Sequence, residues 1–329
     1  MSTILPDGLE PFIAAAGWGG AQVSPLPGDA SFRRYFRLTL AGQRAMLMHA
    51  PPPHEDPAPF LAVAHWLENN GLRAPHILAE DAQKGWVLLE DFGDHRMRDW
   101  LDIHPGDETA IYQAAMGPLV ALGRLPAGPF PPYDMAVYLR EVGLLTEWYA
   151  PAAGLTVDVP GYIAAWEEVL EPLIERQGAG ITVLRDYHAE NIMLLEGGLT
   201  AQGLLDFQDA LAGHPAYDLV SLLQDARRDV SLETEAATLD HYLALTGHDR
   251  APFLADYAVL GAQRNAKIVG IFVRLWQRDG KPRYLGMIPR IWNWLERDLK
   301  HPALAPVAAW FDANIPAELR NAGGGSLGA

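Results

Sequence analysis

Three oxygen-bearing side chains in the second half of the sequence have the types and spacing needed for phosphoryl transfer. Asp186 and Asn191 enclose four residues, and Asp206 follows two leucines further along the chain. In phosphotransferases an Asp at the first of these positions accepts the substrate hydroxyl proton, while the Asn and the later Asp hold Mg²⁺. An isolated Asp-x-x-x-x-Asn usually forms a turn or a cap. The Asp-Phe sequence that follows is what favours catalysis here.

Two short apolar runs must position these side chains. Residues 192–195 and 204–205 read as strands that pair around residues 196–198, Glu-Gly-Gly. Such a hairpin brings Asn191 and Asp206 to the same end. Their amide and carboxylate oxygens are ligands that Mg²⁺ accepts, and the sequence therefore predicts a small-molecule kinase.

Composition limits the class of protein. The chain has 329 residues, of which 49% are hydrophobic and 20% are charged, as in ordinary globular proteins. Its net charge of −16 argues against nucleic acid and anionic membranes as partners, although a local basic cluster still permits ATP. It has no cysteine, no secretory signal in residues 1–10 and no apolar window of membrane length. We therefore expect a soluble, cytoplasmic protein; a monomer is a separate expectation that composition does not test.

The first ninety residues predict a sheet with two nucleotide-binding features. Residues 25–38 read as strand, polar turn and strand, which is either an ordinary hairpin with exposed arginines or a cover for phosphates. The strand over residues 85–93 is either an edge strand or a hinge whose backbone binds adenine. A third strand over 44–49 and a helix over 59–70 lie between them. The candidate ATP-binding residues are Gly28, Asp29, Ser31, Arg33, Arg34, Glu90 and Phe92.

The rest of the chain predicts helices that surround the catalytic loop. Apolar residues recur at helical spacing over residues 108–122, 135–149, 162–176, 252–278 and 288–299. Asp218 lies in the first turn of another helix. It either compensates the helix dipole or hydrogen-bonds the backbone of the Asp186 loop.

With both loops in place, the chain resembles the aminoglycoside phosphotransferase and choline kinase superfamily over residues 25–299. The resemblance includes residues 88–91, 185–191, 206–207 and 215–219. Within that superfamily, residues 28–37, 50–52 and 206–210 resemble the anomeric N-acetylmuramate/N-acetylglucosamine kinases.

The resemblance implies an α+β, bilobal, protein-kinase-like fold. The small, mainly β N-lobe would cover residues 1–93 and the large, mainly helical C-lobe residues 94–329. ATP and Mg²⁺ would be the cofactors, and the substrate an amino sugar phosphorylated at its C1 hydroxyl in peptidoglycan recycling. Asp186 would be the base, with Asn191 and Asp206 at the metal.

One departure from the family concerns the lysine of the third strand. The chain has only Lys84, Lys267, Lys281 and Lys300, and Met48 occupies the usual position. We expect an arginine to bind the phosphates instead, first Arg34 and second Arg33, because an arginine suits bidentate phosphate contacts. The helical Glu that would pair with the lysine has no clear counterpart beyond Glu68.

The candidate sugar-binding residues are chosen only by their position in the sequence. The candidates flank the loops or lie on the long helix: His188, Glu190, Gln208, Asp209, Arg264 and Lys267. The first four are otherwise solvated loop residues or structural hydrogen-bonding groups. Arg264 or Lys267 would meet the carboxylate of N-acetylmuramate, or would be an ordinary helix charge.

Two alternative functions stay open. The acceptor is either an amino sugar or another hydroxyl compound, such as an aminoglycoside or choline, which a substrate panel distinguishes. The missing lysine also allows a non-catalytic nucleotide-binding pseudokinase, although Asp186, Asn191 and Asp206 are all present.

Overall fold

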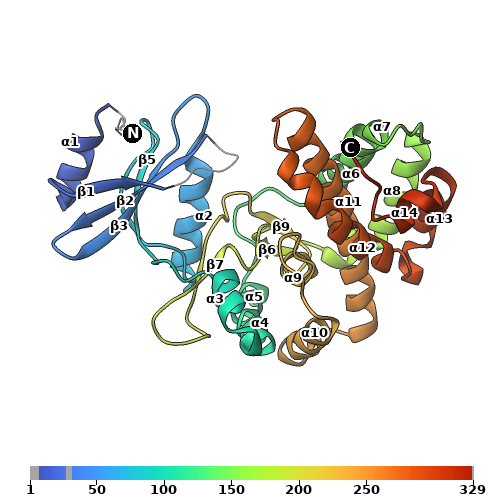
Figure 1. The fold of residues 1–329 in the computed structure, drawn as a ribbon. Helices are drawn as coiled ribbons and strands as arrows, with labels where there is room; N and C mark the ends of the chain where they lie inside the picture. Colours follow the sequence, from blue (N-terminus) through green and yellow to red (C-terminus); the bar gives the residue numbers. More distant parts are fainter. Residues whose placement is uncertain (1–6, 27–31, 328–329) are drawn as a thin grey trace. The chain divides into compact units, whose positions relative to one another are not determined.

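The computed structural model describes residues 7–26 and 32–327, which form two compact units. The N-terminal unit comprises Met1–Trp100 together with Glu190–Asp209, and the C-terminal unit comprises Leu101–Ala189 with Ala210–Ala329. Figure 1 shows strands in the first and mainly helices in the second, as the predicted α+β class requires. None of the helices described is long and apolar enough to cross a membrane.

An antiparallel sheet of five strands forms the N-terminal unit. The strands lie in the order β1-β2-β3-β5-β4 and are β1 Gln22–Pro25, β2 Arg34–Leu40, β3 Gln43–His49, β4 Ile77–Asp81 and β5 Trp86–Glu90. Helix α1 (Leu9–Ile13), which continues into the π-helical turn η1 (Ala14–Trp18), packs its apolar residues on one face of the sheet. Helix α2 (Ala58–Asn69) confirms the helix predicted over residues 59–70.

The register between β2 and β3 assigns each side chain to a face. Arg34 pairs with His49, Tyr35 with Met48, and Phe36 with Leu47. Directly paired residues of antiparallel strands share a face, and neighbours along a strand alternate. Because Phe36 and Leu47 belong to the core under α1, Tyr35 and Met48 point to the opposite face.

The predicted hairpin forms and belongs to the N-terminal unit. Strands β7 (Ile192–Leu194) and β8 (Gln202–Leu204) pair antiparallel, as expected. Leu194 N–H donates to His95 O at 2.8 Å, and Leu204 N–H donates to Arg73 O at 2.8 Å. The rings of Phe60 and Phe207 stack at 5.1 Å. The expected lobes, residues 1–93 and 94–329, therefore differ from the two compact units. The contacts above group residues 190–209 with the sheet.

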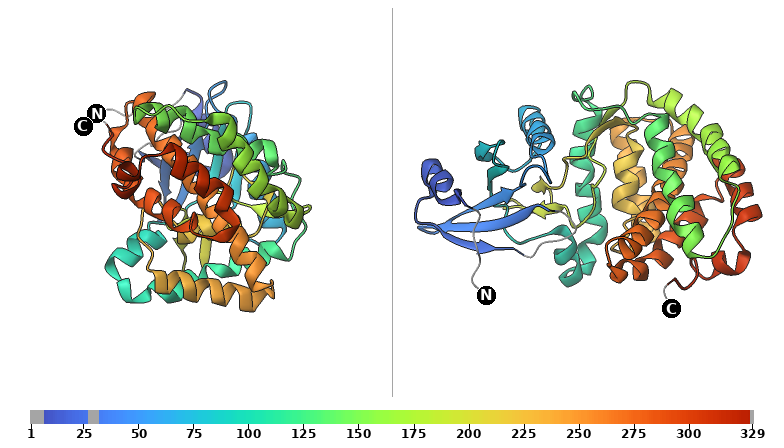
Figure 2. Two further views of the ribbon diagram at one scale, coloured as in Figure 1. Left: turned by 90° about the vertical axis from the view of Figure 1, so that its right-hand side faces the viewer. Right: turned by 90° about the horizontal axis from the view of Figure 1, so that it is seen from above.

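The C-terminal unit is built around helix α11 (Arg250–Gln277), which contacts α6, α8, α9 and α12 (Figures 1 and 2). The other α-helices that follow β5 are α3 Met97–Ile103, α4 Glu108–Ala114, α5 Met116–Gly123, α6 Met135–Leu144, α7 Ala150–Ala152, α8 Val159–Gln177, α9 Ala216–Leu223, α10 Leu232–Thr246, α12 Ile288–Asp298, α13 Ala305–Asn314 and α14 Ala317–Asn321. A π-helical turn, η3 (Leu145–Tyr149), joins α6 to α7. Strands β6 (Ile181–Val183) and β9 (Leu211–Gly213) pair beside the Asp186 loop, here defined as residues 184–189.

Candidate active site

A buried carboxylate in α9 holds the backbone of the Asp186 loop. Asp218 Oδ2 accepts a hydrogen bond from Leu184 N–H at 2.7 Å, and its Oδ1 accepts one from Arg185 N–H at 2.8 Å. Burial raises the pKa of Asp218 to about 6, against the lowering effect of these two bonds. Of the two alternatives for Asp218, the structure therefore shows the hydrogen bonds to the backbone of the Asp186 loop.

The loop is strained at Arg185, one residue before the proposed base. Arg185 has φ 71, which is a left-handed backbone conformation. This conformation is unfavourable in free energy for a residue with a long side chain. Its guanidinium donates to Glu141 Oε1 and lies 5.6 Å from the centre of the Tyr133 ring. Tertiary contacts of the side chain therefore stabilise a backbone conformation that the local sequence disfavours.

Glu141 joins the loop to helices α6 and α11 through a buried cluster of charges. Its carboxylate accepts hydrogen bonds from Arg185, from Lys267 Nζ at 2.9 Å and from Gln263 Nε2 at 3.2 Å. Burial alone would raise the pKa of Glu141, but Lys267 and Arg185 outweigh it and lower that pKa. The carboxylate stays ionised and fixes two cations, which no pattern in the sequence indicated.

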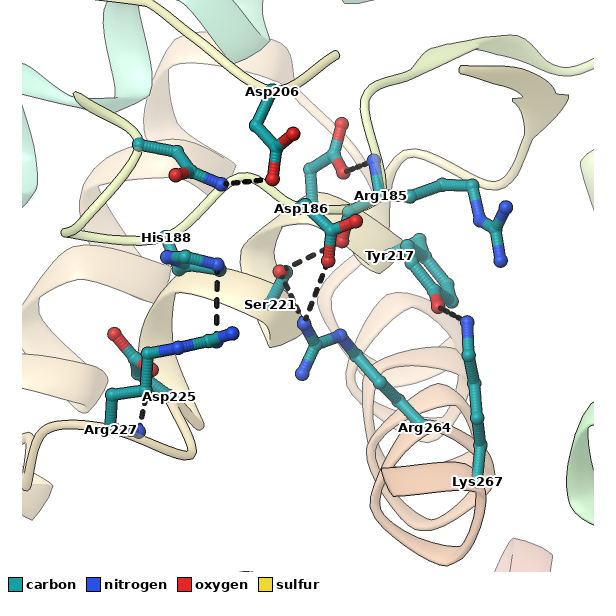
Figure 3. Close-up of polar contacts among 12 residues, drawn as sticks. Arg185, Asp186, His188, Asp206, Tyr217, Ser221, Asp225, Arg227, Arg264 and Lys267 are labelled. Atoms are coloured by element: carbon teal, nitrogen blue, oxygen red, sulfur yellow. Dashed lines mark hydrogen bonds and ion pairs between the residues drawn. The ribbon is translucent and has the colours of Figure 1, made fainter. Parts of the chain in front are cut away.

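The Asp186 carboxylate is accessible while its backbone is fixed (Figure 3). The side chain is 42% exposed, and its Oδ1 lies 4.0 Å from Arg264 Nη2. Arg264 Nη2 also donates to Ser221 Oγ at 2.8 Å, and Ser221 Oγ donates to the carbonyl of Arg185 at 3.0 Å. A substrate hydroxyl can therefore reach a carboxylate whose position is set by α9 and α11.

The hairpin of the N-terminal unit brings the two predicted metal ligands together. Asn191 Nδ2 lies 3.3 Å from Asp206 Oδ2, and Leu205 N–H donates to Asn191 O at 2.9 Å. Asp206 is left-handed with φ 57, a conformation that Asp tolerates better than most residues. Gln208 Nε2 donates to Asp206 Oδ1 at 2.9 Å. The expected convergence of Asn191 and Asp206 is confirmed.

The donor chemistry of this pair fits Mg²⁺. A half-turn of the Asn191 amide would present its oxygen beside the Asp206 carboxylate. Within the parts of the chain that the structure describes, no three His, Cys, Asp or Glu side chains cluster as metal ligands. Mg²⁺ commonly takes only one or two protein oxygens and completes its shell with water and phosphate. Two oxygen ligands therefore suffice for Mg²⁺, although not for a metal that needs a full protein cage.

At the predicted hinge, side chains brace the backbone. Arg73 Nη1 donates to Glu90 Oε2 at 2.7 Å, and the Arg73 guanidinium lies 4.7 Å from the centre of the Phe92 ring. Glu90 N–H already donates to His76 O at 2.9 Å. Adenine binding by residues 90–92 stays a prediction. Because the Glu90 N–H is already bonded, a hydrogen-bond donor to adenine must be a group of this segment other than that N–H.

The remaining candidates have structural partners or lie outside the described residues. Gly28, Asp29 and Ser31 are among the undescribed residues. His188 is buried, and its Nε2 accepts from Arg227 Nη1 at 3.2 Å. Burial, with Arg227 and Arg264, holds the pKa of His188 well below its usual value, so its ring is neutral at pH 7.

Among the remaining sugar candidates, Glu190 pairs with Arg98, and Asp209 is exposed. Arg264 and Lys267 carry the contacts given above, which fix both of them within the C-terminal unit. Sugar binding by these side chains stays a prediction.

Comparison with known proteins identifies relatives along nearly the whole chain. Residues 22–254 match the model of the phosphotransferase enzyme family. The N-acetylmuramate/N-acetylglucosamine kinase of Caulobacter vibrioides is 38% identical over 351 residues, covering 94% of this chain and 96% of its own. The kinase of the same name from Pseudomonas aeruginosa is 38% identical over 312 residues, covering 90% of each chain.

Solved structures share the fold at low sequence identity. A choline/ethanolamine kinase family protein from Mesorhizobium loti matches with a TM-score of 0.63 at 14% identity, covering 92% of this chain and 98% of its own. An ADP-bound aminoglycoside phosphotransferase matches with a TM-score of 0.61 at 13% identity, covering 93% and 99%. The predicted bilobal, kinase-like α+β fold is confirmed.

Replacing Asp218 by Asn tests the anchoring of the Asp186 loop. The amide keeps one acceptor oxygen and turns an NH₂ group toward the second backbone donor. We expect a loss of unfolding free energy of about 1–3 kcal/mol and a fall in kcat of about ten- to a hundredfold through misplacement of Asp186. Chemical denaturation and steady-state kinetics measure the two effects.

Asp298→Asn is the matched control, because Asp298 is a buried acid of the same unit that bonds Gln224 instead of the loop. Burial raises the pKa of Asp298 to about 8, so its side chain is already mostly neutral at pH 7. We expect its kcat to stay within about threefold of wild type. Equal kcat losses in the two variants would contradict a specific role for Asp218.

Proposed function

Because the chain belongs to the phosphotransferase enzyme family, we propose that it is an ATP- and Mg²⁺-dependent kinase for the C1 hydroxyl of N-acetylmuramate and N-acetylglucosamine. The observation that carries this proposal is its similarity, along 94% of its length, to a kinase named for these two sugars. The chain is a phosphotransferase that uses a hydroxyl acceptor. The C1 position and a role in recycling cell-wall sugars in the cytoplasm are the finer parts of the proposal.

The arrangement within each unit supports the chemistry. In the C-terminal unit, Asp186 would accept the proton of the sugar hydroxyl as the bond to phosphorus forms. Asp218 and Ser221 hold the backbone beside it, so little reorganisation is needed when the substrate arrives.

In the N-terminal unit, Asp206 and Asn191 would hold Mg²⁺, which when bound supplies neutralisation of charge on the phosphate oxygens. Asp186 and Asn191 are five positions apart in the sequence, so the loop that carries the base continues directly into a metal ligand. One chain contains all of these groups, and the proposal includes a monomer as the acting form.

The direct test is incubation of the protein with ATP and Mg²⁺ and either sugar. We expect ATP-dependent formation of the sugar 1-phosphate, identified by ³¹P NMR from coupling to the anomeric proton. Choline and an aminoglycoside are the control acceptors. Phosphorylation of a control acceptor in preference to both sugars would contradict the amino-sugar assignment. ATP binding without transfer to any acceptor would favour a pseudokinase.

Asp186→Asn tests the base. Loss of the proton acceptor should lower kcat by about 10²- to 10⁴-fold while the Kd for ATP changes little. Asp240→Asn changes an exposed acid on α10 that pairs with Arg250, and it serves as the control with unchanged kcat. An Asp186→Asn enzyme with wild-type turnover would remove Asp186 from the role of base.

Asp206→Ala tests the metal ligand. Removing the carboxylate of the pair should abolish Mg²⁺-dependent turnover, because only the neutral Asn191 amide would remain. Chelation of the metal with EDTA should do the same to the wild type, and added Mg²⁺ should restore only the wild type. Turnover by Asp206→Ala at ordinary Mg²⁺ concentrations would show that the ligand assignment is wrong.

A further inference from the structure

The position of the usual kinase lysine holds a buried methionine. Met48 is fully buried on the face of the sheet opposite to α1. In the N-terminal unit the single lysine of the sequence, Lys84, pairs with Asp81 at 3.1 Å, and its side chain is 63% exposed. The cation that binds the phosphates of ATP, under the function proposed above, must therefore come from another kind of side chain.

Arg34, the first expectation, lies on the wrong face for this task. Its Nη2 lies 3.2 Å from His49 Nδ1, and its guanidinium lies 5.9 Å from the centre of the Phe36 ring. His49 in turn makes an edge contact with Trp86, a member of the core under α1. The sheet itself therefore separates Arg34 from Met48.

Arg33 lies one residue earlier and makes a different set of contacts. Its Nε forms an ion pair with Glu55 Oε2 at 3.3 Å, with only 16% and 18% of the two side chains exposed. Burial alone would lower the pKa of Arg33, but Tyr35, Glu55 and Asp206 together raise it. Tyr35 is the register partner of Met48. Arg33 therefore interacts electrostatically with Tyr35, which lies on the same face of the sheet as Met48, and with Asp206, the proposed metal ligand.

Local structure fixes the position of Glu55. Its N–H donates to Pro51 O at 3.1 Å, which closes a turn just before α2. The next residue, Asp56, accepts a hydrogen bond from Ala58 N–H at 2.9 Å at the start of that helix. His54, one residue earlier, stacks on Phe32 at 5.3 Å. The segment that carries Glu55 is therefore fastened to the segment that carries Arg33 by two side-chain contacts.

We propose that Arg33, oriented by Glu55, replaces the third-strand lysine as the cation that binds the phosphate chain of ATP. An arginine has five N–H donors, so one guanidinium can bind Glu55 through Nε and still take part in several other hydrogen bonds at once. Its planar fork suits bidentate binding of phosphate oxygens, which a lysine cannot provide. Glu55 takes the part of the acidic partner, for which the sequence offered no clear counterpart beyond Glu68. Glu68 Oε1 lies 2.6 Å from His76 Nδ1.

The test measures binding of adenosine, AMP, ADP and ATP by calorimetry, in the presence of Mg²⁺, to wild type, Arg33→Ala and Arg34→Ala. We expect Arg33→Ala to weaken ATP binding about ten- to a hundredfold, as for loss of a hydrogen bond to a charged group. Adenosine binding should be unchanged, because adenosine has no phosphate. Arg34→Ala is the matched control, and its ATP affinity should stay within about threefold of wild type.

Two further readouts separate phosphate binding from a structural role. Arg33→Ala should raise the KM for ATP while the KM for the sugar is unchanged, and Arg33→Lys should recover part of the ATP affinity because it restores the charge. If Arg33→Ala does not fold, as judged by thermal unfolding, Arg33→Gln replaces it in the same series. ATP binding within about threefold of wild type in the neutral Arg33 variant, or an equal loss in Arg34→Ala, would overturn the inference.

The inference and the proposed function fail in different ways. A wild-type protein that binds ATP through Arg33 but phosphorylates no sugar would contradict the proposed function and support this inference. A wild-type protein that makes the sugar 1-phosphate, with ATP binding indifferent to Arg33, would overturn the inference alone.

Discussion

The geometry of the Asp186 loop depends on the buried carboxylate of Asp218. Each of its oxygens accepts one backbone N–H immediately before Asp186, so α9 sets the direction in which the loop leaves β6. A buried acid without such donors would be costly, and backbone donors without an acceptor would be equally so. The two hydrogen bonds therefore offset the cost of burying the Asp218 carboxylate and the cost of burying the two backbone N–H groups. The result is a short irregular segment whose exposed carboxylate is fixed by a helix.

The Glu141 cluster extends that support to side chains. One carboxylate binds Arg185 and Lys267 together, and the two cations come from the loop and from α11. A buried ion cluster is a weak source of net stability, but loss of one member leaves the others uncompensated. Substitution of any one member is therefore expected to be destabilising. The cluster also holds Arg185 in a backbone conformation that the residue would not adopt alone. In a chain with a net charge of −16, it also keeps positive charge next to the proposed base.

Sequence predicted those parts of the site that depend on local order. The Asn191–Asp206 hairpin followed from two apolar runs and a Glu-Gly-Gly turn. For Asp218 the sequence left two alternatives open, and the structure shows the hydrogen bonds to the loop. Glu141 and Glu55 were missed because their partners lie 44 and 22 positions away in the sequence, where spacing carries no signal. The expectation that placed Arg34 before Arg33 was made without the register of β2 and β3, which puts Arg34 on the same face as Phe36. Strands β6 and β9 pair across the whole of the Asp186 loop and the hairpin, so no short turn between them indicated their pairing, as one did for the equally short β7 and β8. Strand β4 contains Ala, Glu and Asp, which rarely favour strands.

The methionine in the third strand has a consequence for chemical labelling. Many reagents that report on kinases carry an acylating group on a nucleotide and rely on transfer to the amine of that strand. Here the side chain is a thioether, which forms no stable amide, and a guanidinium is a poor acyl acceptor at neutral pH. Such a reagent would therefore form no stable product at the third strand of this protein. Detecting it requires a reporter that does not depend on a reactive amine.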